Sequence, residues 1–93
     1  MTQITEAEFA HIVAGIIADR ENIIRHNPIG TEEEILLWML LSSLISYLSL
    51  TEVETPCFNG RPDADTYRQA IKFVLKNRQA DDFDEVKILS SLK

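Results

Sequence analysis

Residues 35–50 read Ile-Leu-Leu-Trp-Met-Leu-Leu-Ser-Ser-Leu-Ile-Ser-Tyr-Leu-Ser-Leu, and this stretch decides the fold of the 93-residue chain. It holds twelve apolar side chains and four serines, with no charged residue, glycine or proline. In a helix, which turns by about 100° per residue, the serines gather on one narrow side and the apolar residues, Trp38 among them, fill an arc of about 200°. Such a helix must be covered by the rest of the chain, by a partner or by lipid.

Lipid is the least favoured of these coverings. The sixteen residues would span about 24 Å as a helix, whereas the hydrocarbon core of a bilayer is about 30 Å thick. The flanking segments are acidic and contain no Lys or Arg, so they are poor membrane anchors. Their acids are Glu32, Glu33, Glu34, Glu52 and Glu54. We therefore expect no membrane partner and a helix buried within protein.

Short capping patterns mark where helices begin. In a capping box, the side chains of the residue before the helix and of a glutamate three residues later bind each other's backbone N–H groups. The pairs with this spacing are Thr5 with Glu8, Thr31 with Glu34 and, in a looser form, Asp82 with Glu85. Apolar residues at helical spacing follow each pair. Proline-containing segments at 27–30 and 51–62 separate the first three helices.

These signals predict an all-α fold, a single domain over residues 1–93 built as a small bundle of about four helices. The expected helices cover roughly residues 6–26, 32–50, 64–78 and 82–92. The hydrophobic helix at 32–50 should be central and antiparallel to the helix before it, because the connection between them is short. Alternation of Val86 and Ile88 leaves a terminal strand open for the last segment.

The chain is acidic, with a formal net charge of −6, and its charges are unevenly spread. Residues 1–60 hold nine of the fifteen Asp and Glu but only two of the nine Lys and Arg. This balance disfavours nucleic-acid binding, which needs a dense field of basic side chains. It leaves open a different function, an acidic mimic of nucleic acid that blocks a basic site on another protein.

Cysteine usage and the N-terminal sequence favour a cytoplasmic protein. The single cysteine, Cys57, cannot form a disulfide within the chain. The first thirty residues lack the basic stretch, apolar stretch and small-residue site of a secretory leader. Cys57 lies between Pro56 and Phe58, which predicts a thiol packed against the bundle. The alternative is a reactive thiolate favoured by Arg61, four residues later.

Two groups of acidic residues have spacings seen in metal sites. Glu8 and His11 match the Glu-x-x-His element of di-iron and di-manganese bundles, but His11 points away from the apolar face of its helix. The glutamates 32–34 could serve a metal-dependent hydrolase, together with His11 or His26. Acids in the first turn of a helix also stabilise it through the helix dipole, which explains these glutamates without a ligand. We expect no metal, no cofactor and no catalytic residue, with the hydrolase kept as an alternative.

Basic residues form a stripe in the second half of the chain. Arg68, Lys72 and Lys76 recur every four residues on the expected helix at 64–78, and Arg61 precedes them. Such a stripe can contact an anion or an acidic partner, including the acidic first half of a neighbouring chain. It can equally be a solvated helix face.

Small and apolar residues favour protein–protein binding as the leading function. The 45% apolar content is generous for a core of this size, which suggests that a second chain covers part of the surface. Small side chains every four residues on the first helix would let another helix approach closely, although alanine is also simply a good helix former. The candidate interface is Ala10, Ala14, Ala18, Trp38, Leu41, Ile45 and Leu48. We therefore expect a homodimeric, non-enzymatic adaptor, inhibitor or regulatory subunit.

Overall fold

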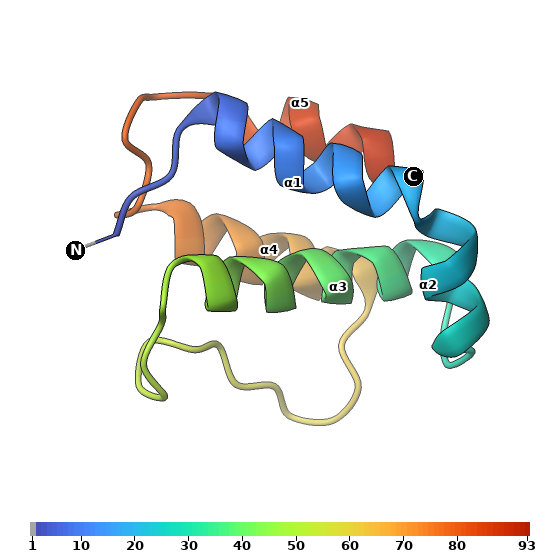
Figure 1. The fold of residues 1–93 in the computed structure, drawn as a ribbon. Coiled ribbons are helices and arrows are strands. Elements are labelled where there is room, and N and C mark those ends of the chain that lie inside the picture. Colours follow the sequence, from blue (N-terminus) through green and yellow to red (C-terminus); the bar gives the residue numbers. More distant parts are fainter. Residues whose placement is uncertain (1) are drawn as a thin grey trace.

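The structure is a computed structural model that describes residues 2–93, and within this range the fold is all-helical (Figure 1). Five α-helices are followed by one short 3-10 helix. They are α1 (Glu6–Ala18), α2 (Arg20–His26), α3 (Glu32–Tyr47), α4 (Ala64–Leu75), α5 (Glu85–Leu89) and η1 (Ser90–Leu92). The predicted all-α class is confirmed. The predicted number of four helices is wrong, because the first expected helix is divided in two.

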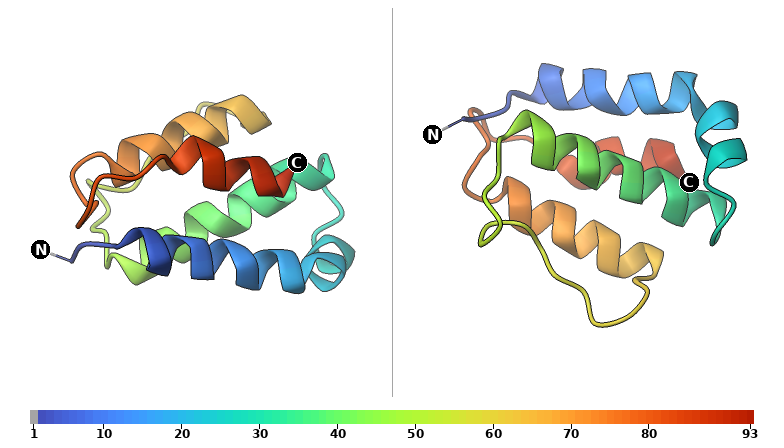
Figure 2. Two further views of the ribbon diagram at one scale, coloured as in Figure 1. Left: turned by 90° about the horizontal axis from the view of Figure 1, so that it is seen from above. Right: turned by 60° about the horizontal axis from the view of Figure 1, so that its bottom comes forward.

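The division falls at Asp19, which separates α1 from α2. Asp19 leaves the helical conformation, with φ −105° and ψ 16°, and its N–H contacts the carbonyl groups of the last turn of α1. Aspartate is a weak helix former, since its side chain competes for backbone hydrogen bonds. The chain changes direction here, and α2 closes one end of the molecule between α1 and α3 (Figure 2). The buried Ile23 of α2 joins the core.

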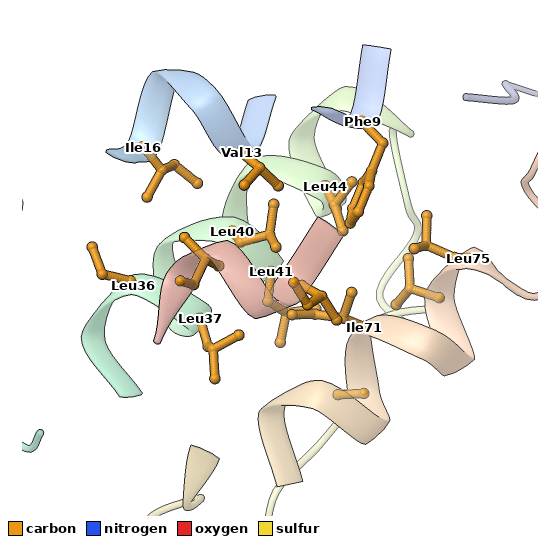
Figure 3. Packing of buried hydrophobic residues seen from close by; sticks show 14 of the residues in the cluster. Phe9, Val13, Ile16, Leu36, Leu37, Leu40, Leu41, Leu44, Ile71 and Leu75 are labelled. Atoms are coloured by element: carbon orange, nitrogen blue, oxygen red, sulfur yellow. The ribbon is translucent and has the colours of Figure 1, made fainter. Parts of the chain in front are cut away.

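Helix α3 supplies the largest share of the core. Its side chains Leu36, Leu37, Leu40 and Leu44 are completely buried (Figure 3). The helix packs against α1, α2, α4 and η1. Its serine side is its most open side, where Ser42 is half-buried and Ser46 is exposed. The tryptophan predicted to lie in the buried arc is instead on the edge of this open side and is partly exposed.

Helix α3 begins at the predicted residue but ends before the predicted one. Its start is confirmed, because Thr31 and Glu34 form the expected capping box. Its end is three residues earlier than expected, at Tyr47. Ser49 has a positive φ of 51°, a left-handed conformation that ends helices.

None of the helices among residues 2–93 combines the length and the hydropathy that a span of a lipid bilayer requires.

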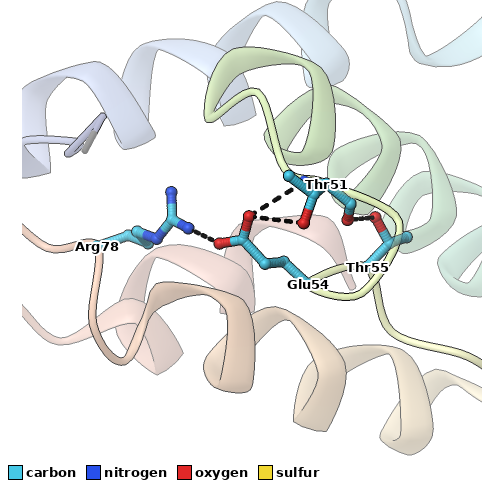
Figure 4. A network of polar contacts seen from close by, with 4 residues as sticks. All are labelled: Thr51, Glu54, Thr55 and Arg78. Atoms are coloured by element: carbon cyan, nitrogen blue, oxygen red, sulfur yellow. Dashed lines mark hydrogen bonds and ion pairs between the residues drawn. The ribbon is translucent and has the colours of Figure 1, made fainter.

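The segment at 48–63 is a long loop that leaves α3 and returns to the start of α4 (Figure 1). Within it, Glu54 accepts hydrogen bonds from the N–H and hydroxyl groups of Thr51 and also binds Arg78 (Figure 4). Asp63 caps α4 by accepting the N–H of Thr66 at 2.8 Å. Helix α4 ends at Leu75 rather than 78, so Arg78 lies in the following turn.

The C-terminal segment is helical, so the strand alternative for 82–92 is wrong. The helix is shorter than expected, because its cap is Asp84 rather than Asp82. Phe83 stacks on Phe9 of α1, with ring centroids 5.6 Å apart. Ile4 pairs with the turn after α4: its N–H binds the Arg78 carbonyl at 2.7 Å, and its carbonyl accepts the N–H of Ala80 at 2.9 Å.

Candidate functional site

Three arginines from three different segments bind the acidic start of α3. The pairs are Arg20 with Glu32, Arg68 with Glu33 and Arg61 with Glu34. The nitrogen–oxygen distance is 3.0 Å in the Arg20 and Arg61 pairs. These arginines belong to α2, to α4 and to the loop before α4. The glutamates 32–34 therefore connect three segments to α3, in addition to interacting with its helix dipole.

Gly30 allows one of these connections. Its φ of +98° lies in the left-handed region, where side chains other than glycine are strained. A Cβ atom at this position would also collide with the guanidinium of Arg61. Arg61 thus passes close over the turn between α2 and α3 to reach Glu34, which simultaneously caps the helix through Thr31.

The arrangement of acids gives little support to the alternative of a metal-dependent hydrolase. Among residues 2–93, no group of three or more His, Cys, Asp and Glu side chains is placed to hold a metal ion. His11 is exposed, and the ring of His26 contacts the carbonyl of Asn22 in its own helix. Glu8 is bound to the hydroxyl of Tyr47 and to the N–H of Thr5. The histidines and acids weighed for a hydrolase are therefore in separate places.

The contact between Glu8 and Tyr47 joins the start of α1 to the end of α3 and shifts both pKa values. The hydrogen bond from the Tyr47 hydroxyl, followed by the bonds from Thr5, lowers the pKa of the Glu8 carboxyl. The same hydrogen bond raises the pKa of Tyr47. A carboxylate with a lowered pKa in the folded state stabilises the fold above its ordinary pKa, near 4.5. That stabilisation is lost as the pH falls through the lowered value.

We expect Tyr47→Phe to raise the pKa of Glu8 and to make stability less sensitive to acid below about pH 4.5. The phenyl ring is kept, so only the hydroxyl donor is lost. A carboxyl-detected NMR titration of Glu8 measures the first effect, and urea unfolding at several pH values measures the second. The matched control is Tyr67→Phe, which should leave the pKa of Glu8 unchanged. An unchanged Glu8 titration in Tyr47→Phe would contradict the assignment.

Trp38 is the central feature of a second region, a surface pocket beside the start of α3. Its side chain is 41% exposed, and the neighbouring Ile29 is 75% exposed. The pocket has a volume of about 220 Å³, with the buried Ile35 among its lining residues. We call its rim the Trp38 surface, which consists of the exposed Ile29, Trp38 and Arg61 and the half-buried Pro62 and Tyr67.

The structure divides the candidate interface residues into three groups. Leu41 and Leu48 are buried in the core of their own chain, so they have no surface to offer a partner. Trp38 is partly exposed and Ile45 is half-buried on the open side of α3. The three alanines of α1 are exposed, so no other part of the described chain covers them. Two of them, Ala10 and Ala14, line a groove of about 470 Å³ between α1 and α5.

The basic stripe is also divided. Arg61 and Arg68 bind glutamates of the same chain, whereas Lys72 and Lys76 point to solvent. The acidic first half of the chain therefore meets the two arginines within one molecule. Sequence reasoning missed this because the paired residues are far apart along the chain. The only signal was the separation of acids and bases between the two halves.

Cys57 is exposed, so the prediction that it packs against the bundle is wrong. Its sulfur is 3.9 Å from the carbonyl oxygen of Thr55, two residues earlier in the loop. The neighbouring Phe58 packs inward instead, edge-on to Tyr67 with ring centroids 5.6 Å apart. The guanidinium of Arg61, which would activate the thiol in the alternative of a reactive thiolate, is bound to Glu34.

Comparison of the chain with protein-family models, with curated proteins and with solved structures gave no match.

Proposed function

We propose that this chain acts by binding protein, as an adaptor, inhibitor or regulatory subunit, and that it forms a homodimer through the Trp38 surface. The observation that carries the proposal is an exposed tryptophan beside an exposed isoleucine at one pocket, with Trp38 at 41% and Ile29 at 75% exposure. In the proposed dimer, α3 is the central helix of the assembly, because the open serine side of this helix is next to Trp38 and would also face the partner.

The residue types on this surface are those that contribute most to protein interfaces. Tryptophan, tyrosine and arginine are enriched among residues that dominate binding energy, and Trp38, Tyr67 and Arg61 line the same pocket. Covering the exposed part of one tryptophan would contribute on the order of 2 kcal/mol. Burying Ile29 as well would add to this term. The hydrophobic gain is thus concentrated in a small area.

The charges at the same pocket suit contact between two identical copies. Arg61 and Glu34 lie together at the pocket, with opposite charges. In a two-fold symmetric dimer, the same surface of each copy faces the other, so a contact from one residue to a second is repeated from the second to the first. A surface that carries both charges is therefore self-complementary. An arginine of one copy can then approach a glutamate of the other without leaving an unpaired charge.

The other two candidate functions draw less support. A hydrolase would need converging carboxylates, but each of the glutamates 32–34 is bound to an arginine. An acidic mimic of nucleic acid would need free acids along one surface. Glu8 and Glu54 are also bound, to Tyr47 and Arg78, so many acids of the first half are already neutralised or hydrogen-bonded.

We expect Trp38→Ala to convert a dimer to a monomer at a protein concentration of about 100 μM. Sedimentation equilibrium would give about twice the 10.6 kDa chain mass for the original protein and one chain mass for the variant. Trp38 is the only tryptophan, so its quenching by acrylamide should also weaken as the concentration rises. Circular dichroism should show the same helix content, because the side chain is partly exposed.

Phe73→Ala is the matched control, since it removes an exposed aromatic ring that lines a different hollow from the Trp38 pocket. It should leave the dimer intact. A monomer at about 100 μM for the original protein would overturn the homodimer, as would equal dissociation of both variants.

A further inference from the structure

We infer that the outer face of α4 is a second docking surface, which binds an acidic, amphipathic segment of another protein. We call it the Lys72 surface, and it consists of Lys72, Phe73, Lys76, Val86 and Lys93. It shares no residue with the Trp38 surface. The inference therefore stands whether or not the homodimer forms.

The first observation is a group of unpaired lysines in an acidic protein. All four ion pairs recorded among residues 2–93 use arginine, so none of them engages a lysine. Lys72 is on the exposed side of α4, and the exposed Lys76, one turn later, is the C-cap of that helix. Lys72 and Lys93 line a hollow of about 260 Å³ between α4 and the C-terminal segment. Asp65 is the one acidic residue that lines this hollow. The surface is thus locally basic on a chain with net charge −6.

The second observation is exposed apolar area on the same face. Phe73, adjacent to Lys72, is 69% exposed. It lines a second hollow, of about 270 Å³, together with Leu50 and the 96% exposed Val53. On the other side of the lysines, Val86 is partly exposed in the first hollow. Large apolar side chains grouped in this way mark interaction sites rather than solvated helix faces.

These two observations together define the partner. Carboxylates are needed opposite Lys72 and Lys76, and apolar side chains are needed over Phe73 and Val86. Residues 69–76, the end of α4 and its C-cap, extend about 10 Å, which corresponds to two turns of a partner helix. A nucleic acid would supply anionic charge but no aliphatic side chains for Phe73, and its phosphates would be repelled by the rest of this acidic chain. An acidic amphipathic helix supplies both groups at the required spacing.

The test uses the full chain and a synthetic helical peptide with glutamates on one face and leucines at the i, i+3, i+4 and i+7 positions. Two matched peptides replace either the glutamates with lysine or the leucines with serine. In a titration followed by amide NMR shifts, we expect the first peptide to bind with a Kd of about 100 μM and to shift Lys72, Phe73 and Lys76. Both matched peptides should bind about tenfold more weakly or worse.

Variants of the chain complete the test. Lys72→Glu with Lys76→Glu, and separately Phe73→Ala, should weaken binding by about tenfold or more. Lys87→Glu is the control, because Lys87 is an exposed lysine that lines the groove between α1 and α5 instead. All of these side chains are exposed, so the fold should be retained.

Three results would overturn the inference. Equal binding of the lysine peptide would show that charge is irrelevant, and equal binding of the serine peptide or of poly-glutamate would show charge attraction without a docking surface. The third result is self-association without peptide: the mass of the complex grows steadily with the concentration of the chain, and Lys72→Glu dissociates it. The surface would then bind other copies of this chain.

Discussion

Leu40→Ala is expected to lower the free energy of unfolding by about 3 kcal/mol. Leu40 lies in the middle of α3, is completely buried and belongs to the core shared with α1 and α4 (Figure 3). Truncation removes buried apolar area and leaves a cavity that the surrounding helices can close only in part. A chain of this length has a total stability of about 5–14 kcal/mol, so the loss is a large fraction of it. Urea unfolding followed by circular dichroism measures the change.

Val53→Ala is the control for this prediction. Val53 is 96% exposed, so removing its two methyl groups should change the free energy of unfolding by less than about 0.5 kcal/mol. Both measurements belong at low protein concentration, where self-association does not contribute. Losses of similar size at the two positions would contradict the placement of α3 at the core.

Local patterns in the sequence were sufficient to predict where most helices begin. Thr5 and Thr31 cap α1 and α3 as expected, because a capping box is a contact between residues three positions apart. The serines that were predicted to gather on one side of α3 lie on its most open side. These features depend on a helix and its own side chains, so no knowledge of the tertiary structure was needed.

Features that depend on contacts between distant segments could not be predicted. The wheel of α3 placed Trp38 with the leucines, yet its side chain is 41% exposed and lies one helical turn from Ser42, at the edge of the open side. Whether an edge position is covered depends on which segment packs beside it. The same limit applies to Arg68, whose partner Glu33 is on another helix. The end of α1 at Asp19 is a local break, but aspartate often occurs inside helices, so the residue alone does not indicate it.

The loop at 48–63 is held by an ion pair with a buried arginine, Arg78. The side chain of Arg78 is only 10% exposed, and its guanidinium binds Glu54 (Figure 4). No buried side-chain nitrogen or oxygen in residues 2–93 lacks a hydrogen-bond partner. Glu54→Ala would leave the Arg78 charge in place with its carboxylate removed, a change that costs more than the net value of the pair itself.

We expect Glu54→Ala to lower the free energy of unfolding by about 1–3 kcal/mol, less than for a fully buried pair because the Glu54 side chain is 40% exposed. Glu54→Gln distinguishes the effect of the lost charge from the effect of the lost turn, since the glutamine amide oxygen can still accept both hydrogen bonds from Thr51. Combining Glu54→Ala with Arg78→Met should cost less than the sum of the single changes, because the second substitution removes the unpaired charge. Urea unfolding of the four-member cycle measures this coupling, with the neighbouring exposed Glu52→Ala as control. Strictly additive losses would mean that Arg78 does not depend on Glu54 and that the loop is held by its apolar contacts alone.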